Sequence, residues 1–468
     1  MRILIIGAGE TGFYIASEFS EDNFDVALVD ENPDQLKIIQ RSLNVAGILG
    51  NGTSLSILEQ AGIQESDLLI ACTDHDETNL ICCLLADHYK VRQKIAVTRT
   101  GSYLRKKDIS RYLESGVTQI INSSLVTAQE IVSTANITSA AEVSAFGKKN
   151  VLLIGYRIRD ESPWKDLYLT EIRKGKNLSQ FLIASIVREG KSFIPDGSSQ
   201  IQLGDYVYIL TPRQNANDLN ELLDEKISTN RRAVIAGDNQ IAERVAIGLL
   251  KSHYSVTMIC QNELELSKIK KTFSSKKKFT AVLGAPEVVK LQLKLDVSKS
   301  SLFIAVTNDD SQNIASCIVA QYLGVRKTIC LVNKQEIIPS AEKSEIDVII
   351  SPRLSTARLV KKLIRGGESS LNYTTISETN MEVIEVITST ESSIINQHLK
   401  DISLPSNCLI GAIIKDQNRA VIPSGNTILE PDDQVIIVTI PENAAKIREM
   451  LEGSARKNSG LEDQISYH

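Results

Sequence analysis

Residues 2–19 begin with an apolar run, continue through a glycine-rich turn and pass into a helical pattern. The turn reads Gly7-Ala8-Gly9-Glu10-Thr11-Gly12. In a strand–turn–helix context, the first glycine permits a tight turn, the second lets a pyrophosphate approach the backbone, and the third lets the helix pack on the strand. Free N–H groups at the helix N-terminus attract phosphates. The segment therefore predicts a dinucleotide-binding loop.

An acidic residue follows at the spacing that such a loop needs. Asp30 ends the next apolar run, "DVALVD", 18 residues after Gly12. A carboxylate there can accept hydrogen bonds from both ribose hydroxyls and would repel a 2′-phosphate, which favours NAD(H) over NADP(H). The alternative interpretation is a scaffold of the same fold that binds no nucleotide.

Two further loops are expected at the same edge of the sheet. In "GILGNGTS", Asn51 lies between two glycines, where the chain can approach an adenine or a ribose. In "CTDHDETN", Asp74 and Glu77 have the spacing of a capping box, with Asp74 as the N-cap. Thr73 and Asp74 also lie beside the crevice in which open α/β sheets bind ligands. Glu77 is expected to act in capping, whereas a ligand contact remains open for Thr73 and Asp74.

The sequence repeats itself in the same order, at an offset of roughly 230 residues. The matching segments are 2–12 with 232–242, 68–79 with 302–313, 118–132 with 347–360, and 193–210 with 421–438. Such ordered matches at a single offset indicate a tandem duplication.

Each half contains two different patterns of expected secondary structure. Short β-like runs at 2–6, 25–29, 45–48, 67–71, 94–98 and 119–121 alternate with helical patterns. This alternation predicts βαβ units and a parallel sheet with helices on both faces. After about residue 140, short strands and turns predict a smaller α+β unit. The expected fold class is α/β, with two tandem doubly wound Rossmann-like parallel-sheet domains, each followed by a small α+β domain. The expected boundaries are 1–140, 141–228, 229–370 and 371–455, with a mobile tail at 456–468.

Composition excludes several classes of protein. The net charge of −5 argues against nucleic-acid binding, and the lysine runs at 268–271 and 276–278 are interpreted as solvated. Seven cysteines without a CxxC pair predict buried thiols in a reducing compartment, and five scattered histidines predict no metal site. We find no apolar run of membrane-spanning length and no signal peptide, so a soluble, cytosolic protein is expected.

Groups that could consume the nucleotide are hard to find. A dehydrogenase needs a proton-transfer group near the nicotinamide. The one histidine of the predicted site is His75, in a loop that capping explains. The sequence therefore predicts binding without turnover and no catalytic residues, and an NAD-dependent enzyme remains the alternative.

The combined motifs resemble the TrkA family of potassium uptake proteins, in which tandem RCK (KTN) domains are each followed by a TrkA-C domain. The segments that carry the resemblance are 7–12, Asp30, "GNGTS" at 50–54, "TDHDETN" at 73–79, "FIPDG" at 193–197 and "VIPSG" at 421–425. They extend the resemblance over about residues 1–455.

The resemblance implies a regulatory subunit of a potassium uptake transporter, peripheral at the cytoplasmic face of the cell membrane. It implies a homo-oligomeric ring beneath an integral membrane partner of the TrkH or TrkG type. NAD(H) is the implied ligand, with ATP or ADP as a further one. A related RCK regulator of another ion transporter or channel is the second interpretation.

Several positions depart from the family pattern. Val97 stands where the family commonly has an arginine and Arg99 follows, so a phosphate-facing cation is missing or displaced. In the second half, Asn239 replaces the middle glycine and Cys260 replaces the acidic residue. A scaffolding role is therefore expected for the second Rossmann domain.

The last helical segment of each Rossmann domain carries an apolar stripe. Leu125, Ala128, Ile131 and Val132 recur at helical spacing within 124–137, and 353–364 is its counterpart. The stripe packs either on its own sheet or, as the resemblance implies, on a neighbouring unit as a crossover helix. In the second case, replacing Leu125 and Ile131 with Asp is expected to break an oligomer.

Overall fold

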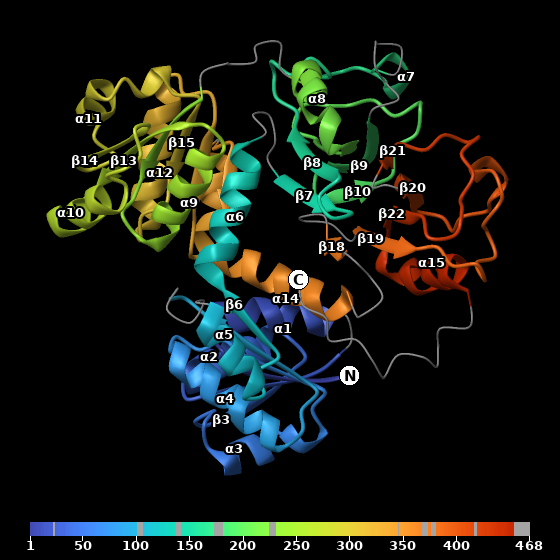
Figure 1. The fold of residues 1–468 in the computed structure, drawn as a ribbon, viewed down its shortest axis with the longest axis horizontal. Coiled ribbons are helices and arrows are strands. Elements are labelled where there is room, and N and C mark those ends of the chain that lie inside the picture. The colour runs from blue at the N-terminus through green and yellow to red at the C-terminus, as the bar shows by residue number, and fades with distance from the viewer. Residues whose placement is uncertain are drawn as a thin grey trace. The chain divides into compact units, whose positions relative to one another are not determined.

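The computed structural model describes residues 1–21, 24–100, 106–136, 142–172, 181–223, 231–344, 346–366, 373–375, 381–415 and 419–453. The expected mobile tail lies outside these residues. The chain forms two compact units, Met1–Val132 with Asn230–Lys361, and Ser133–Thr229 with Lys362–His468. The first unit contains both Rossmann-like domains, and the second contains both small domains (Figure 1).

The first Rossmann domain has a parallel sheet with strand order β3-β2-β1-β4-β5-β6. Its elements are β1 (Arg2–Ile6), α1 (Glu10–Glu21), β2 (Asp25–Asp30), α2 (Pro33–Ser42), β3 (Ala46–Leu49), α3 (Leu55–Gln60), β4 (Leu68–Ala71), α4 (Asp76–His88), β5 (Gln93–Thr98), α5 (Lys106–Glu114), β6 (Gln119–Asn122) and α6 (Ser123–Ala135). This is the doubly wound order of dinucleotide-binding folds, so the expected fold class is confirmed.

The central strands are apolar on both faces because helices cover both sides of the sheet. Leu4 and Ile6 of β1 pack with Leu58 of α3 and Leu80 of α4 in one core cluster. On α1, Phe19 is fully buried. A two-faced core explains why "ILII" shows no alternation of apolar and polar residues.

The second Rossmann domain repeats the topology with strand order β14-β13-β12-β15-β16-β17. Its elements are β12 (Arg232–Ala236), α9 (Gln240–Lys251), β13 (Ser255–Cys260), α10 (Glu263–Thr272), β14 (Phe279–Leu283), α11 (Val289–Lys294), β15 (Leu302–Ala305), α12 (Asp310–Tyr322), β16 (Thr328–Leu331), α13 (Ile338–Lys343), β17 (Val348–Ile350) and α14 (Pro352–Gly366). The same strand order in both halves agrees with the tandem duplication.

Each small domain is built on a five-stranded antiparallel sheet, with matching orders β10-β9-β11-β8-β7 and β21-β20-β22-β19-β18. The first contains β7 (Glu142–Phe146), β8 (Val151–Arg157), α7 (Leu169–Ile172), β9 (Leu182–Arg188), β10 (Lys191–Phe193), β11 (Tyr206–Pro212) and α8 (Ala216–Leu223). The second contains β18 (Tyr373–Thr375), β19 (Glu382–Ile387), β20 (Cys408–Lys415), β21 (Arg419–Val421), β22 (Gln434–Thr439) and α15 (Pro441–Glu452).

The two small domains share one hydrophobic core. Phe146 and Leu210 of the first lie in the same buried cluster as Met381 and Ile436 of the second. A Cβ on Gly411 would lie 2.1 Å from the Leu210 Cδ1 atom, so a larger residue there would displace the Leu210 side chain. The second unit is therefore a paired domain rather than two separate ones.

The Rossmann domains are joined by their last helices. From α6, Ser123 accepts a hydrogen bond from Thr356 of α14 at 3.0 Å, and Glu130 pairs with Arg358 at 3.8 Å. Val132 of α6 lies against α9, where a Cβ on Gly248 would come within 2.6 Å of the Val132 Cγ2 atom. The helix α6 thus packs on the neighbouring domain, and within this structure that neighbour is the second half of the same chain (Figure 1).

This contact changes the expectation for charges placed on α6. Ile131 is fully buried, whereas Gln129 on the same helix is exposed. We predict that Ile131→Asp lowers the stability of the first unit by roughly 3 kcal/mol or more, because it buries an unpaired charge and removes apolar contacts. Gln129→Asp is the matched control and is expected to change little. Calorimetric unfolding of both variants checks this, and equal melting temperatures would contradict it.

Candidate nucleotide-binding site

The glycine loop has the geometry that each glycine predicts. Gly7 has a φ of +108°, and a Cβ there would lie 3.0 Å from the Thr73 nitrogen. A Cβ on Gly12 would lie 1.9 Å from the Gly7 carbonyl oxygen, so α1 reaches the strand end only because this residue lacks a side chain. In contrast, a Cβ on Gly9 would meet nothing within 4 Å. The space over Gly9, at the N-terminus of α1, is therefore open.

Asp30 faces this loop from the end of β2. Its Oδ2 atom accepts a hydrogen bond from the Ala8 N–H at 2.6 Å, and its Oδ1 atom accepts one from the Asn32 N–H at 2.7 Å. These bonds fix the carboxylate beside the loop. Each carboxylate oxygen has a second lone pair, so Asp30 keeps the capacity to accept ribose hydroxyls.

Two other residues of the loop differ in their surroundings. Glu10, the first residue of α1, forms an ion pair with Arg353 of α14. Thr11 follows it and is half-buried. The loop of the first domain therefore touches a side chain that the second domain supplies.

The loop after β3 packs against β1 through a glycine. A Cβ on Gly52 would lie 2.2 Å from the Ile6 Cγ2 atom. Asn51 is exposed, and its Oδ1 atom accepts hydrogen bonds from the Thr53 N–H at 2.7 Å and from the Thr53 hydroxyl at 2.5 Å. The side-chain carbonyl of Asn51 thus stabilises its own turn.

The capping box predicted for "TDHDETN" is wrong. Helix α4 begins at Asp76, its N-cap is His75, and the His75 side chain makes no capping hydrogen bond. Asp74 lies outside the helix and forms an ion pair with Arg99. The first residue of the helix is the buried Asp76, so Glu77 is the second helical residue and not the third, as the capping box requires.

Two buried polar residues that the sequence reasoning missed hold this edge together. Asn79 accepts hydrogen bonds from the Thr73 N–H at 2.8 Å and hydroxyl at 2.7 Å, and donates to the Val97 carbonyl at 2.8 Å. Asp76 accepts from the backbone N–H groups of Arg99 at 2.9 Å and Thr100 at 3.0 Å. Together they tie the end of β4 to the end of β5.

A sequence signal for this network exists in the duplication. The second half has Thr307, Asp310 and Asn313 at the same spacing as Thr73, Asp76 and Asn79. Asn313 accepts from the Thr307 N–H at 2.8 Å and donates to the Leu331 carbonyl at 3.0 Å. The repeated polar spacing therefore indicates a structural hydrogen-bond network, which stabilises each half whether or not that half binds a ligand.

The arginine that departs from the family pattern reaches the same edge. Val97 is buried within β5, whereas Arg99 is exposed and pairs with Asp74. A cation is therefore displaced by two positions and not lost from this edge of the sheet.

In the second Rossmann domain, side chains fill the corresponding loop. The Asn239 carbonyl accepts a hydrogen bond from the Ala242 N–H at 3.0 Å, and its amide donates to the Val306 carbonyl at 2.7 Å and to Asn308 at 3.0 Å. The Asn239 side chain thus occupies the helix N-terminus that a phosphate would use, and the scaffolding role of this domain stays a prediction.

The carboxylate of the second domain has also moved. Asp238 in the loop accepts hydrogen bonds from the Gln261 N–H at 3.0 Å and the Asn262 N–H at 3.3 Å. In place of Asp30, the strand ends in the buried Cys260, whose pKa burial raises to about 12. The loop and the strand end remain connected, but the strand ends in a thiol and not in a carboxylate.

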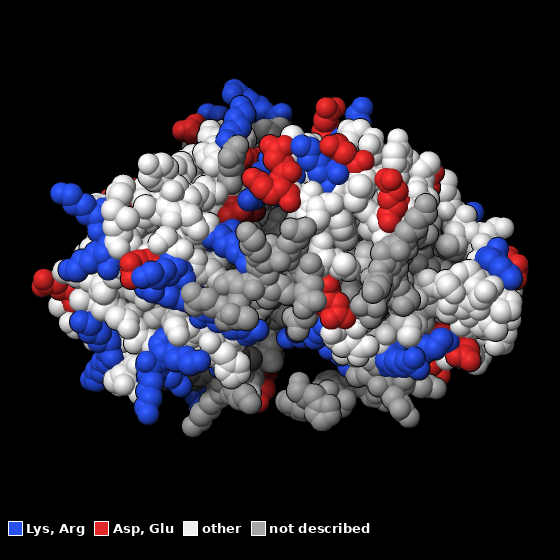
Figure 2. Space-filling view, turned by 90° about the horizontal axis from the view of Figure 1, so that it is seen from above, with Lys and Arg blue, Asp and Glu red and all other residues white. Residues whose placement is uncertain are grey.

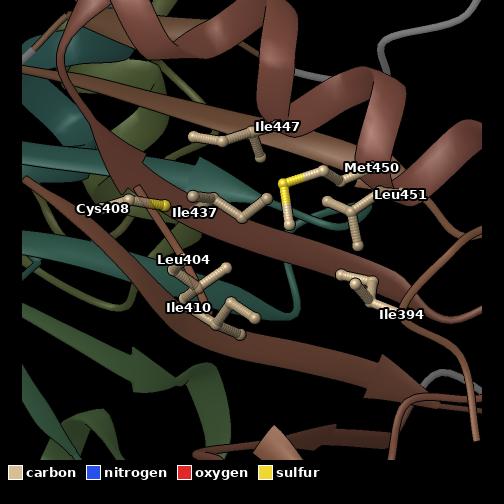
Figure 3. Close-up of a pocket in the computed structure, with 8 residues that line it drawn as sticks. All are labelled: Ile394, Leu404, Cys408, Ile410, Ile437, Ile447, Met450 and Leu451. Carbon is tan, nitrogen blue, oxygen red and sulfur yellow. The ribbon is translucent and has the colours of Figure 1, made fainter. Parts of the chain in front are cut away.

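A pocket in the second small domain is a gap in its core (Figure 3). Figure 3 shows Ile447, Met450 and Leu451 of α15 facing Cys408 and Ile410 of β20 and Ile437 of β22. Burial raises the pKa of the Cys408 thiol to about 11, so this thiol stays neutral. The lining offers no charged group to orient a ligand.

Other site types find little support in the described residues. No cluster of three His, Cys, Asp or Glu suited to a metal occurs there. All seven cysteines are free thiols, six of them buried. Lys268, Lys270 and Lys271 on α10 are exposed, as are Lys276–Lys278, and Figure 2 shows acidic side chains among the basic ones on the face that it presents. Every described helix is too short or too polar to cross a bilayer.

Comparison with known proteins gives matches over nearly the whole chain. A Trk system potassium uptake protein TrkA from Azorhizobium caulinodans is 27% identical over 457 residues, which cover 96% of this chain and 98% of that protein. The TrkA protein of Halomonas elongata is 28% identical over 456 residues, with coverage of 96% and 98%.

Solved structures share the fold at low identity. The GsuK RCK domain matches with a TM-score of 0.59 at 16% identity, covering 96% of this chain and 94% of that chain. The GsuK channel matches with a TM-score of 0.61 at 17% identity, covering 96% of this chain and 78% of that chain.

Family models match both halves in the same order. The TrkA-N domain matches residues 3–123 and 233–352, and the TrkA-C domain matches residues 153–224 and 383–452. The TrkA-N domain alone accounts for more than half of the chain, so the chain belongs to the TrkA family and carries two TrkA-N domains, each followed by a TrkA-C domain.

Proposed function

We propose that this protein is a regulatory subunit of a potassium uptake system that binds NAD(H) in its first Rossmann domain. The observation that carries the proposal is the open space over Gly9, between the N-terminus of α1 and the fixed carboxylate of Asp30. The relatives named as Trk system potassium uptake proteins support the transport role, and a GsuK channel structure with NAD bound supports the choice of ligand. ATP or ADP is the alternative ligand of the same site.

Different residues of the first domain would contact different parts of the ligand. The loop from Gly7 to Gly12 would hold the pyrophosphate through backbone N–H groups and the dipole of α1. Asp30 would accept hydrogen bonds from the adenosine ribose. Asn51 follows β3, and Thr73 and Asp74 follow β4, so all three lie at the carboxyl edge of the sheet, from which they would contact the ligand.

The nucleotide acts as an effector in this proposal. Bound to a dehydrogenase, NAD(H) would supply hydride-transfer chemistry, which needs a protein proton donor or acceptor beside it. Cys72 lies under the loop, and burial raises its pKa to about 12, so it is a neutral thiol at physiological pH. His75 is exposed at the start of α4. We therefore propose that the chain binds nucleotide without turning it over.

Regulation requires a partner whose state depends on nucleotide occupancy. We propose an integral membrane potassium-translocating subunit of the TrkH or TrkG type, with this chain as a peripheral homo-oligomeric ring at the cytoplasmic face. A ligand shifts such an equilibrium only by its different affinities for the two states, so coupling must be reciprocal. Partner binding would then change nucleotide affinity.

The ribose contact can be tested with one substitution. We predict that Asp30→Ala weakens NADH binding by roughly 10- to 150-fold, because hydrogen bonds to a charged acceptor are worth about 1.5–3 kcal/mol. Asp34→Ala, which removes an exposed carboxylate of α2, is the matched control. Titration calorimetry on the full chain measures both, and equal NADH affinity in the two variants would refute this role for Asp30.

Absence of turnover is tested separately. NADH incubated with the protein and a panel of carbonyl substrates is expected to keep its nicotinamide absorbance. A protein-dependent loss of absorbance that Gly9→Val abolishes would instead indicate an enzyme.

Purification of the tagged chain from native membranes tests the partner. We expect a polytopic membrane protein to be retained, and its retention to change when NADH is added. Recovery of the chain from the soluble fraction alone, under conditions that preserve membrane complexes, would argue against a membrane partner.

A further inference from the structure

The side chain of Arg353 comes from the second Rossmann domain but contacts Glu10 in the glycine loop of the first. We propose that Arg353 neutralises Glu10 when the site is empty, and that the nucleotide phosphates compete with Glu10 for its guanidinium when the site is filled. This inference rests on the proposed nucleotide binding and extends it to a device that couples the first domain to the second.

The position of the pair supports a role toward a phosphate. Glu10 immediately follows Gly9, whose surroundings are open, and it starts the helix whose N-terminus faces the phosphate position. The Glu10 side chain is 42% exposed and that of Arg353 is 27% exposed, so the pair is reachable from solvent. Arg353 also donates a hydrogen bond to the Asn333 carbonyl at 3.1 Å, which anchors the guanidinium to the second domain.

A second ion pair aligns the two helices. Lys361 of α14 binds Glu18 of α1 at 2.5 Å. Glu10 and Glu18 are eight residues apart on α1, and Arg353 and Lys361 are eight residues apart on α14, so the helices run in the same direction over roughly 12 Å. The helix that follows the glycine loop is therefore bound to the second domain by an ion pair near each of its ends.

The equivalent contact in the repeat, between α6 and α9, lacks these charges. Gln240 and Ser124 stand where the repeat would place Glu10 and Arg353. At the other end of that contact, Gly248 and Val132 meet in apolar packing instead of an ion pair. The two ion pairs therefore occur beside the open glycine loop, and the apolar contact occurs beside the loop that Asn239 fills.

Electrostatics explains why the intact loop needs the arginine. A carboxylate beside the pyrophosphate position repels an incoming anion, and Arg353 cancels this repulsion. Phosphates that attract the guanidinium weaken its pair with Glu10, which loosens the start of α14 from α1. Nucleotide occupancy in the first domain is thereby transmitted to a helix of the second.

The test compares the two partners of the pair by NADH calorimetry on the full chain. Arg353→Gln is expected to weaken NADH binding about tenfold or more, because it leaves Glu10 unopposed and removes a charge-assisted contact. Glu10→Gln is expected to bind NADH at least as tightly as the wild type. Arg353→Lys keeps the charge and is expected to restore most of the affinity, which keeps the test decisive if Arg353→Gln folds poorly.

The control variant is Lys361→Gln, which breaks the other ion pair. It is expected to lower the melting temperature and leave NADH affinity unchanged. If Glu10→Gln and Arg353→Gln weaken binding equally, the pair only supports the fold and the proposal is overturned. A wild-type chain that binds neither NADH nor ADP would refute the proposed function itself, which is a distinct outcome.

Hydrogen exchange gives an independent readout of coupling. Addition of NADH is expected to change exchange in peptides covering 353–361, and α12 serves as the internal reference. This change should vanish in Arg353→Gln at NADH concentrations that saturate the variant. Identical ligand-induced changes in the variant and the wild type would show that Arg353 does not transmit occupancy.

Discussion

Exchange of the last helix between the two Rossmann domains is the constraint on which the first unit depends. Helix α6 leaves the first sheet and packs on α9 of the second domain, while α14 leaves the second sheet and binds α1 of the first through Arg353 and Lys361. Each domain thus contributes a helix that covers the other. Loss of either helix would expose apolar surface on both domains, so the unit is expected to fold and respond as one body.

Duplication preserved the connections of the strand edge while the chemistry of the site diverged. Both halves keep a buried asparagine, Asn79 or Asn313, because an unpaired backbone group at the strand end would cost free energy whatever the site binds. The link between loop and second strand also survives, with its carboxylate moved from Asp30 to Asp238. The openness over Gly9 did not survive in the second half, since Asn239 occupies it. Structural hydrogen bonds are thus retained in both halves, although the glycine loop is open in only one of them.

The sequence predicted features whose signals are local, and it missed those that depend on distant contacts. Strand positions, the order of domains and the distinct roles of Gly7, Gly9 and Gly12 follow from apolar periodicity and from steric rules that act over a few residues. The capping box at Asp74 failed because a buried Asp76 bonds to the backbone after β5, a contact made across 23 residues of chain. The choice between the two packing modes of α6 was also open, since an amphipathic stripe does not specify which surface covers it. The pairing of Glu10 with Arg353 spans the duplication and has no local signature.

A carboxylate next to a phosphate site is unfavourable unless a cation compensates its charge. The domain that supplies the cation decides which parts of the protein respond when a nucleotide binds. Compensation from the same domain would make the first site self-contained, so nucleotide binding would leave the second domain unaffected. Here Arg353 is anchored through the Asn333 carbonyl to the second domain, and α1 is bound to α14 again at Glu18. Any change in the charge balance at Glu10 therefore alters a contact between domains. Under the proposed function, the second half can in this way take part in the response although a side chain fills its own loop, because it supplies the counter-charge of Glu10.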